Sequence, residues 1–201
     1  MTPTSYLPTK PLARADGKRS IGWWGIWTLV VTEGSLFGYL LLSYFYLAAQ
    51  TEAHWPPEGL PKLMMPGINT VILLSSSVFV WLSERCIRHR RIRLGLLPMG
   101  IAIVLGATFV AIQMREWGKK DYGIASNLYG SLYFTITGFH VVHVIIGLTI
   151  LSLLLLWTAL GYFNQKRYGP IVIGGLYWHF VDAVWLFIFS TFYLLPYLQG
   201  R

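Results

Sequence analysis

Long apolar runs, separated by short segments that carry charges or prolines, make up most of this chain. The longest run without a formal charge extends from about 128 to 160. At 1.5 Å per residue it is longer than the roughly 30 Å hydrocarbon core of a bilayer. The pattern therefore predicts an all-α integral membrane protein with five transmembrane helices, at about residues 23–49, 67–85, 94–114, 128–160 and 176–198.

The segments between the runs are polar or rich in proline. Residues 1–20 hold three prolines and four basic residues and have little apolar surface to bury, so we expect them to lie along a surface. The prolines of residues 50–66 and the glycines of residues 161–175 predict loops. Residues 21–201 are then a single five-helix transmembrane domain.

Composition supports the membrane assignment. Charged residues make up 12% of the chain, against about 25% in soluble domains, and 55% of the residues are hydrophobic. The net charge of +8 comes from basic residues in the short connecting segments, where they set topology and meet lipid headgroups, so it does not indicate nucleic acid. The single cysteine, Cys86, excludes an intramolecular disulfide and any multi-thiolate cluster.

Lysines and arginines divide unevenly between the two sides of the predicted membrane domain. Eleven fall on the side of the N-terminus and five on the side of the C-terminus. Basic residues accumulate in cytoplasmic segments, so the N-terminus is predicted inside and the C-terminus outside. Aromatic belts at the two membrane boundaries are expected to include Trp157, Tyr162, Tyr193 and Tyr197.

His140 and His143 interrupt the longest apolar run and lie three residues apart, on one face of a helix. Ionisable side chains inside a membrane point into protein rather than lipid, so both predict partners on neighbouring helices. The candidates are Glu33, His179 and Asp182. Depths estimated from helix rise place all five side chains in the inner half of the membrane, where they can meet.

Three interpretations of this polar group remain open. Histidine and carboxylate at helical spacing can ligate zinc or iron. Buried acids and imidazoles can instead relay protons. In the third interpretation each group only satisfies a partner on another helix, with Glu33 protonated and the histidines neutral. The spacing is not specific enough to establish a metal site.

Two longer motifs resemble a known family. They are Gly138-Phe139-His140 with His143 and Gly147, and the run from Tyr177 to Phe187 that contains Trp178-His179-Phe180-Val181-Asp182. Together they resemble subunit III of the haem–copper oxidases, above all cytochrome c oxidase. Shorter matches are spread along about residues 22–197: Glu33, His54-Trp55-Pro56-Pro57-Glu58-Gly59, Asn69-Thr70, Glu116 and Tyr129-Gly130-Ser131.

The resemblance implies a non-catalytic subunit that packs against subunit I, holds lipid between its helices and supports proton uptake. Glu33 then corresponds to a buried acid whose counterpart reacts with carbodiimides. Four residues correspond to interior groups that pair helices: His140, His143, His179 and Asp182. Lipid contacts are expected at Trp55 and Trp178, and at Arg85 and Arg88 in the basic turn after the second run.

The residue inventory argues against redox chemistry in this chain. A haem–copper catalytic subunit would need six histidine ligands in its helices, whereas His140, His143 and His179 are the ones placed in the runs. We therefore expect no catalytic residue and no metal ligand here, with haems and copper in partner subunits and phospholipid as the bound molecule. The larger family members have seven spans, so this chain resembles shorter bacterial forms with five.

The resulting prediction is a lipid-holding core subunit of a terminal respiratory oxidase, in contact with subunits I and II, in a bacterial or archaeal cytoplasmic membrane. Within the family, the alternative is the corresponding subunit of a quinol oxidase or a homologue that accompanies nitric oxide reductase. From another class, the alternative is a stand-alone proton-conducting or transport protein built on Glu33, His143 and Asp182.

Overall fold

The computed structural model describes residues 21–51, 55–57, 59–89, 91–163 and 168–198. Within these residues the chain is helical and contains no β-strand. The helices are α1 (Ile21–Gln50), α2 (Met64–Arg88), α3 (Ile92–Trp117), α4 (Leu128–Ala159) and α5 (Gly169–Phe189). After α5 the helix continues through a π-helical turn, η1 (Ser190–Leu194), into α6 (Leu195–Leu198).

Five helical segments in the described part of the chain are long and apolar enough to cross a membrane, which confirms the predicted number of spans. The largest difference concerns the last one. It begins at Gly169, about seven residues before the predicted start, so the second half of the expected loop at 161–175 was wrong. Pro170 lies in the first turn of α5, where its missing N–H costs nothing. Gly174 packs so closely on α4 that an added Cβ would lie 2.5 Å from Leu154.

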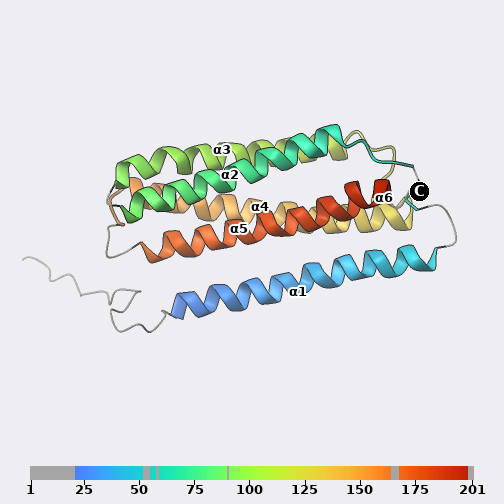
Figure 1. Cartoon of the computed structure of the whole chain (residues 1–201), viewed down its shortest axis with the longest axis horizontal. Helices are drawn as coiled ribbons and strands as arrows, with labels where there is room; N and C mark the ends of the chain where they lie inside the picture. Colours follow the sequence, from blue (N-terminus) through green and yellow to red (C-terminus); the bar gives the residue numbers. More distant parts are fainter. Residues whose placement is uncertain (1–20, 52–54, 58, 90, 164–167, 199–201) are drawn as a thin grey trace, which may run out of the picture.

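Figure 1 shows the helices as a row of roughly parallel rods, with α2 and α3 side by side, α4 and α5 next to them, and α1 at the edge. α4 and α5 have the central places, because α4 contacts α1, α3 and α5, and α5 contacts α1, α2 and α4. α1 packs on α5 and α4, and of the five spans it is the one least buried by the rest of the described chain. Only 11% of its most apolar stretch is buried, so lipid or another protein must cover the rest.

Aromatic side chains of α5 fill the core between the other helices. Trp178 is completely buried, and its indole Nε1 donates to Ser76 Oγ on α2 at 2.9 Å. Two helical turns further along, Trp185 is also completely buried and donates from Nε1 to Thr70 Oγ1 on α2 at 2.9 Å. Both indoles thus bury a large apolar ring and satisfy their polar atom, which fixes α5 against α2.

Candidate functional site: polar contacts between the membrane helices

Glu33 on α1 and His143 on α4 form an ionisable pair in the membrane domain. His143 Nε2 lies 3.1 Å from Glu33 Oε2, and His143 Nδ1 lies 2.7 Å from the carbonyl oxygen of Phe139. A carbonyl only accepts, so Nδ1 carries a hydrogen. The contact between Nε2 and Oε2 must then hold one further proton, on the imidazole or on the carboxyl group. The Glu33 side chain is 33% exposed at the flank of the bundle.

A second polar group joins α2 to α5. Ser77 Oγ lies 2.7 Å from His179 Nδ1 and also makes a short hydrogen bond to Asp182 Oδ2. Asp182 is buried, and its Oδ1 has no hydrogen-bond partner in the described residues. His179 is half-buried. A serine hydroxyl, which both donates and accepts, therefore bridges two side chains of one helix from the helix beside it.

His140 lies apart from both groups. Its side chain is completely buried among three aromatic rings, with centroid distances of 5.0 Å to Trp185, 5.9 Å to Phe109 and 6.4 Å to Phe37. Neither of its ring nitrogens has a hydrogen-bond partner among the described residues. His140 thus packs as an aromatic ring, without a hydrogen bond to another helix of the described chain.

The five side chains that the sequence grouped together are therefore divided in three. Glu33 pairs with His143, His179 and Asp182 share Ser77, and His140 is surrounded by rings. Ser77 was not among the candidates, although it lies in the serine run Ser75–Ser77, because a membrane serine usually bonds to its own helix. Among the described residues, no three His, Cys, Asp or Glu side chains come together as a metal site would require.

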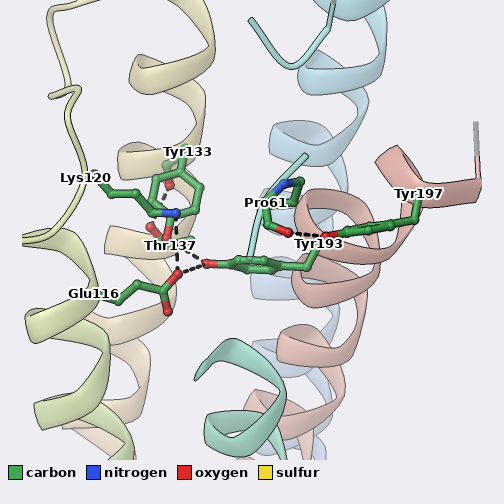
Figure 2. Close-up of polar contacts among 7 residues, drawn as sticks. All are labelled: Pro61, Glu116, Lys120, Tyr133, Thr137, Tyr193 and Tyr197. Carbon is green, nitrogen blue, oxygen red and sulfur yellow. Dashed lines mark hydrogen bonds and ion pairs between the residues drawn. The ribbon is translucent and has the colours of Figure 1, made fainter. Parts of the chain in front are cut away.

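Another polar cluster lies where the end of α3, the start of α4 and η1 meet (Figure 2). Tyr193 OH donates to Glu116 Oε1 at 2.8 Å. Since that hydrogen is used, the 2.8 Å contact between the two hydroxyls is a bond donated by Tyr133 to Tyr193. Lys120 Nζ lies 3.5 Å from Glu116 Oε1 and 5.2 Å from the centroid of the Tyr133 ring.

The sequence analysis did not predict this cluster, which consists of Glu116, Lys120, Tyr133 and Tyr193. Tyr193 was predicted to belong to an aromatic belt, which is wrong, because its side chain is 1% exposed. The available signal was a glutamate in the last turn of α3 with tyrosines in two later apolar runs, but nothing in the sequence shows that they meet. A hollow of about 300 Å³ lies beside the cluster and is lined in part by Glu116 and Lys120.

The residues expected to touch lipid differ in their exposure. Trp178 is completely buried within the chain, which leaves no surface of its ring for a lipid and corrects that expectation. Trp55 is 7% exposed.

Arg85 and Arg88 are exposed at the end of α2, where Arg88 Nη2 lies 2.5 Å from Glu84 Oε1. His54 and Glu58, which belong to the proline-containing motif, lie outside the described residues.

Comparison with known proteins gives one family. The family model described as cytochrome c oxidase subunit III matches residues 17–197. The chain is 33% identical over 174 residues to a protein of Thermostichus vulcanus named cytochrome c oxidase subunit 3, with 85% of this chain and 86% of the relative covered.

Two further relatives carry the same name. The protein of Synechocystis sp. is 35% identical over 184 residues, which cover 89% of this chain and 78% of the relative. The protein of Struthio camelus is 34% identical over 177 residues, which cover 85% of this chain and 68% of the relative. The family model therefore covers the described membrane helices up to residue 197.

Proposed function

Since the chain belongs to the cytochrome c oxidase subunit III family and is thereby a subunit of a haem–copper oxidase, we propose that it packs against subunit I as a non-catalytic, lipid-holding subunit. The haems and copper are carried by partner subunits, and subunit II is a further neighbour. In this role the chain stabilises subunit I and supports its proton uptake, while the complex reduces dioxygen and moves protons.

The observation that carries this proposal is how the interior polar groups are used. Trp178 and Trp185 bond to serine and threonine of α2, Asn69 Nδ2 donates to the Phe109 carbonyl of α3 at 3.2 Å, and Ser77 bridges two groups of α5. Each of these hydrogen bonds joins α2 to another helix, either α3 or α5. Such contacts stabilise a scaffold, as expected of a subunit whose partners carry the redox chemistry.

The sparse cover of α1 supports a role in holding lipid or a neighbouring subunit. Its outward face carries large side chains, with Trp24 63%, Tyr39 71% and Leu42 68% exposed. An apolar face of this extent in a membrane is filled by acyl chains or by another protein. Glu33, one third exposed on the same helix, is the acid that such a neighbour would reach.

The chain is a multi-pass membrane protein. We propose that it lies in a bacterial or archaeal cytoplasmic membrane with the N-terminus inside, as its basic residues predict. In that orientation the exposed Arg85 and Arg88 face the anionic inner leaflet, where they bind lipid phosphates. The cluster around Glu116 then lies at the outer surface.

Purification of the tagged chain from its own membranes in mild detergent tests the proposal. We expect a coloured preparation with a haem spectrum, in which mass spectrometry finds a histidine-rich haem subunit and a copper subunit. The identity of the donor-side subunit separates a cytochrome c oxidase from a quinol oxidase. A homogeneous, colourless chain that conducts protons alone in liposomes, and loses this activity with Glu33→Gln, would instead establish a transport protein.

A further inference from the structure

Oxidisable aromatic rings lead from the hollow beside Glu116 into the interior of the bundle. Tyr122 lines the hollow, and its ring centroid lies 6.1 Å from that of Tyr133. The centroid of Tyr133 lies in turn 6.4 Å from that of Tyr193, whose side chain is buried. Both spacings are those of rings in contact, between which electrons move readily. A one-electron oxidant in the hollow can therefore take an electron from Tyr193 without touching it.

The hydroxyl group of Tyr193 has a proton acceptor in place. It donates to Glu116 Oε1 at 2.8 Å (Figure 2), within the distance over which a positioned base takes a proton. A phenol that has lost an electron is a strong acid, so its proton passes to the carboxylate. Tyr133 donates to the same hydroxyl oxygen at 2.8 Å and continues to do so once the proton has left. The neutral tyrosyl radical thus keeps a hydrogen bond.

The ammonium group of Lys120 couples the loss of the electron to the loss of the proton. Its Nζ lies 5.2–5.9 Å from the ring centroids of Tyr122, Tyr133 and Tyr193. A cation at this distance is attracted by electron-rich rings and disfavours a positive charge on them. A radical cation is therefore unfavourable at these rings, whereas a neutral radical is not. The positive charge that the site gains remains on Lys120, which lines the hollow, where water can solvate it.

Two other tyrosines of the chain lack this combination. Tyr197 OH donates to the Pro61 carbonyl, and Tyr177 OH donates to the His143 carbonyl at 3.4 Å. A main-chain carbonyl oxygen accepts a hydrogen bond but is too weak a base to keep a proton. The Tyr197 ring is also 43% exposed, so a radical on it would meet and couple with other radicals, whereas burial prevents such coupling at Tyr193.

The lining of the hollow indicates the class of oxidant. Leu60 and Met65 line it together with Lys62 and Lys119, so it admits a molecule with both apolar and polar parts. Peroxyl radicals, which form when unsaturated acyl chains react with dioxygen, are one-electron oxidants of this kind. They are the oxidants that a protein meets in a membrane.

We propose that Tyr193 and Glu116 form a redox-active site, which gives one electron to a peroxyl radical in the hollow by way of the two rings between them. The electron turns the peroxyl radical into a hydroperoxide anion, which takes a proton from water and leaves a hydroxide ion. Tyr193 loses its O–H bond, the proton forms a new O–H bond on Glu116, and a neutral tyrosyl radical remains. The inference goes beyond the proposed function and does not depend on how the chain packs in a complex.

Electron paramagnetic resonance on the full chain in mild detergent locates the radical. A water-soluble azo initiator under air supplies peroxyl radicals, and samples are frozen during the reaction. With 3-fluorotyrosine at position 193, we expect a tyrosyl signal with the added splitting of the fluorine nucleus. The matched position is Tyr197, in the same final helical segment, where 3-fluorotyrosine should leave the signal unsplit. Absence of a tyrosyl signal, or a signal that fluorine at position 193 leaves unsplit, would overturn the proposal.

The variant Glu116→Gln tests the proton acceptor, because glutamine still accepts a hydrogen bond from Tyr193 but does not take its proton. With 3-fluorotyrosine at position 193, we expect the fluorine-split signal to grow about 100-fold more slowly, the low end of what a positioned base contributes. Lys119→Gln, which lines the same hollow, is the matched control and should leave the rate unchanged. Near-ultraviolet circular dichroism verifies that each variant is folded. Equal rates for Glu116→Gln and the unsubstituted chain would overturn the role of Glu116.

Replacement of H2O by D2O gives the same test without a substitution. Since the proton of Tyr193 moves as the electron leaves, the signal should grow more slowly in D2O. An equal rate in the two solvents would overturn the coupled proton transfer.

Discussion

The ring of Trp178 occupies the space that a side chain at Gly106 would need. A Cβ added to Gly106 on α3 would lie 2.6 Å from Cη2 of Trp178, which is far inside van der Waals contact. Gly147 on α4 borders the same ring, since its added Cβ would lie 2.8 Å from Trp178 Cε3. Two glycines on different helices therefore form the slot for one indole.

Gly106→Val is expected to lower the stability of the chain by about 1–3 kcal/mol, because the new side chain must displace a completely buried ring. Thermal unfolding in detergent, followed by the loss of native near-ultraviolet circular dichroism, measures the change. Gly100→Val on the same helix is the matched control, because an added Cβ there meets nothing within 4 Å. Equal unfolding temperatures for the two variants would contradict the packing described here.

Tyr193→Phe is expected to destabilise the chain more than Tyr197→Phe. Tyr193 OH receives a bond from Tyr133 and donates to Glu116, so its removal takes the acceptor from the buried Tyr133 hydroxyl and leaves Glu116 with Lys120 alone, at a cost of about 1–3 kcal/mol. Tyr197 OH donates to the Pro61 carbonyl at 2.6 Å, but its side chain is 43% exposed and water can replace the bond. Unfolding temperatures of the two variants give the comparison, and a larger effect of Tyr197→Phe would count against it.

The number of spans could be predicted because a bilayer imposes a minimum length and excludes charge, and both properties are visible in one sequence. The residue at which α5 begins could not be predicted in this way. Gly174 and Gly175 are typical of a loop in isolation, yet they lie inside the helix, where Gly174 packs against Leu154. A glycine needed for close packing and a glycine needed for a turn look the same in the sequence.

The pairing of polar groups could be predicted only in part. Helices that are apolar on every side have little amphipathic pattern, so their rotation about their own axes is not visible in the sequence. This is why His140 and His143, predicted to point the same way to polar partners, have different surroundings, a set of aromatic rings and a carboxyl group. Depth estimates placed the five candidates at similar levels but could not separate them around the bundle.

Glu33 and His143 are expected to act as one unit in a double-mutant cycle. His143→Leu removes the partner of a carboxyl group in the membrane, whereas in the Glu33→Gln background the same change leaves only a neutral amide. We therefore expect the second change to cost less, with a coupling energy of about 0.5–3 kcal/mol, toward the lower end because Glu33 is partly exposed. Unfolding temperatures of the four proteins measure it, and strictly additive effects would contradict the pairing.

In the assembled oxidase, Glu33→Ala is expected to leave the haem spectrum unchanged, and His143→Leu is expected to reduce the yield of complex rather than its turnover per haem. Both residues join α1 to α4 within this chain, so their loss weakens the scaffold and leaves the redox centres of the partner intact. The visible spectrum and the rate of oxygen consumption per haem separate the two effects. A normal yield with no turnover would show that the pair takes part in the reaction.

The orientation of the chain is a prediction from its basic residues, and it can be tested directly. Arg91 lies between α2 and α3, Arg93 lies in the first turn of α3, and we expect both inside. Lys119 and Lys120, after α3, are expected outside. In a Cys86→Ser background, a cysteine at His89 should react with a membrane-impermeant maleimide only after the cells are broken. A cysteine at Lys119, which is likewise exposed, should react with intact spheroplasts. The opposite labelling pattern would place the basic turn outside and reverse the whole topology, because all five spans are connected in series.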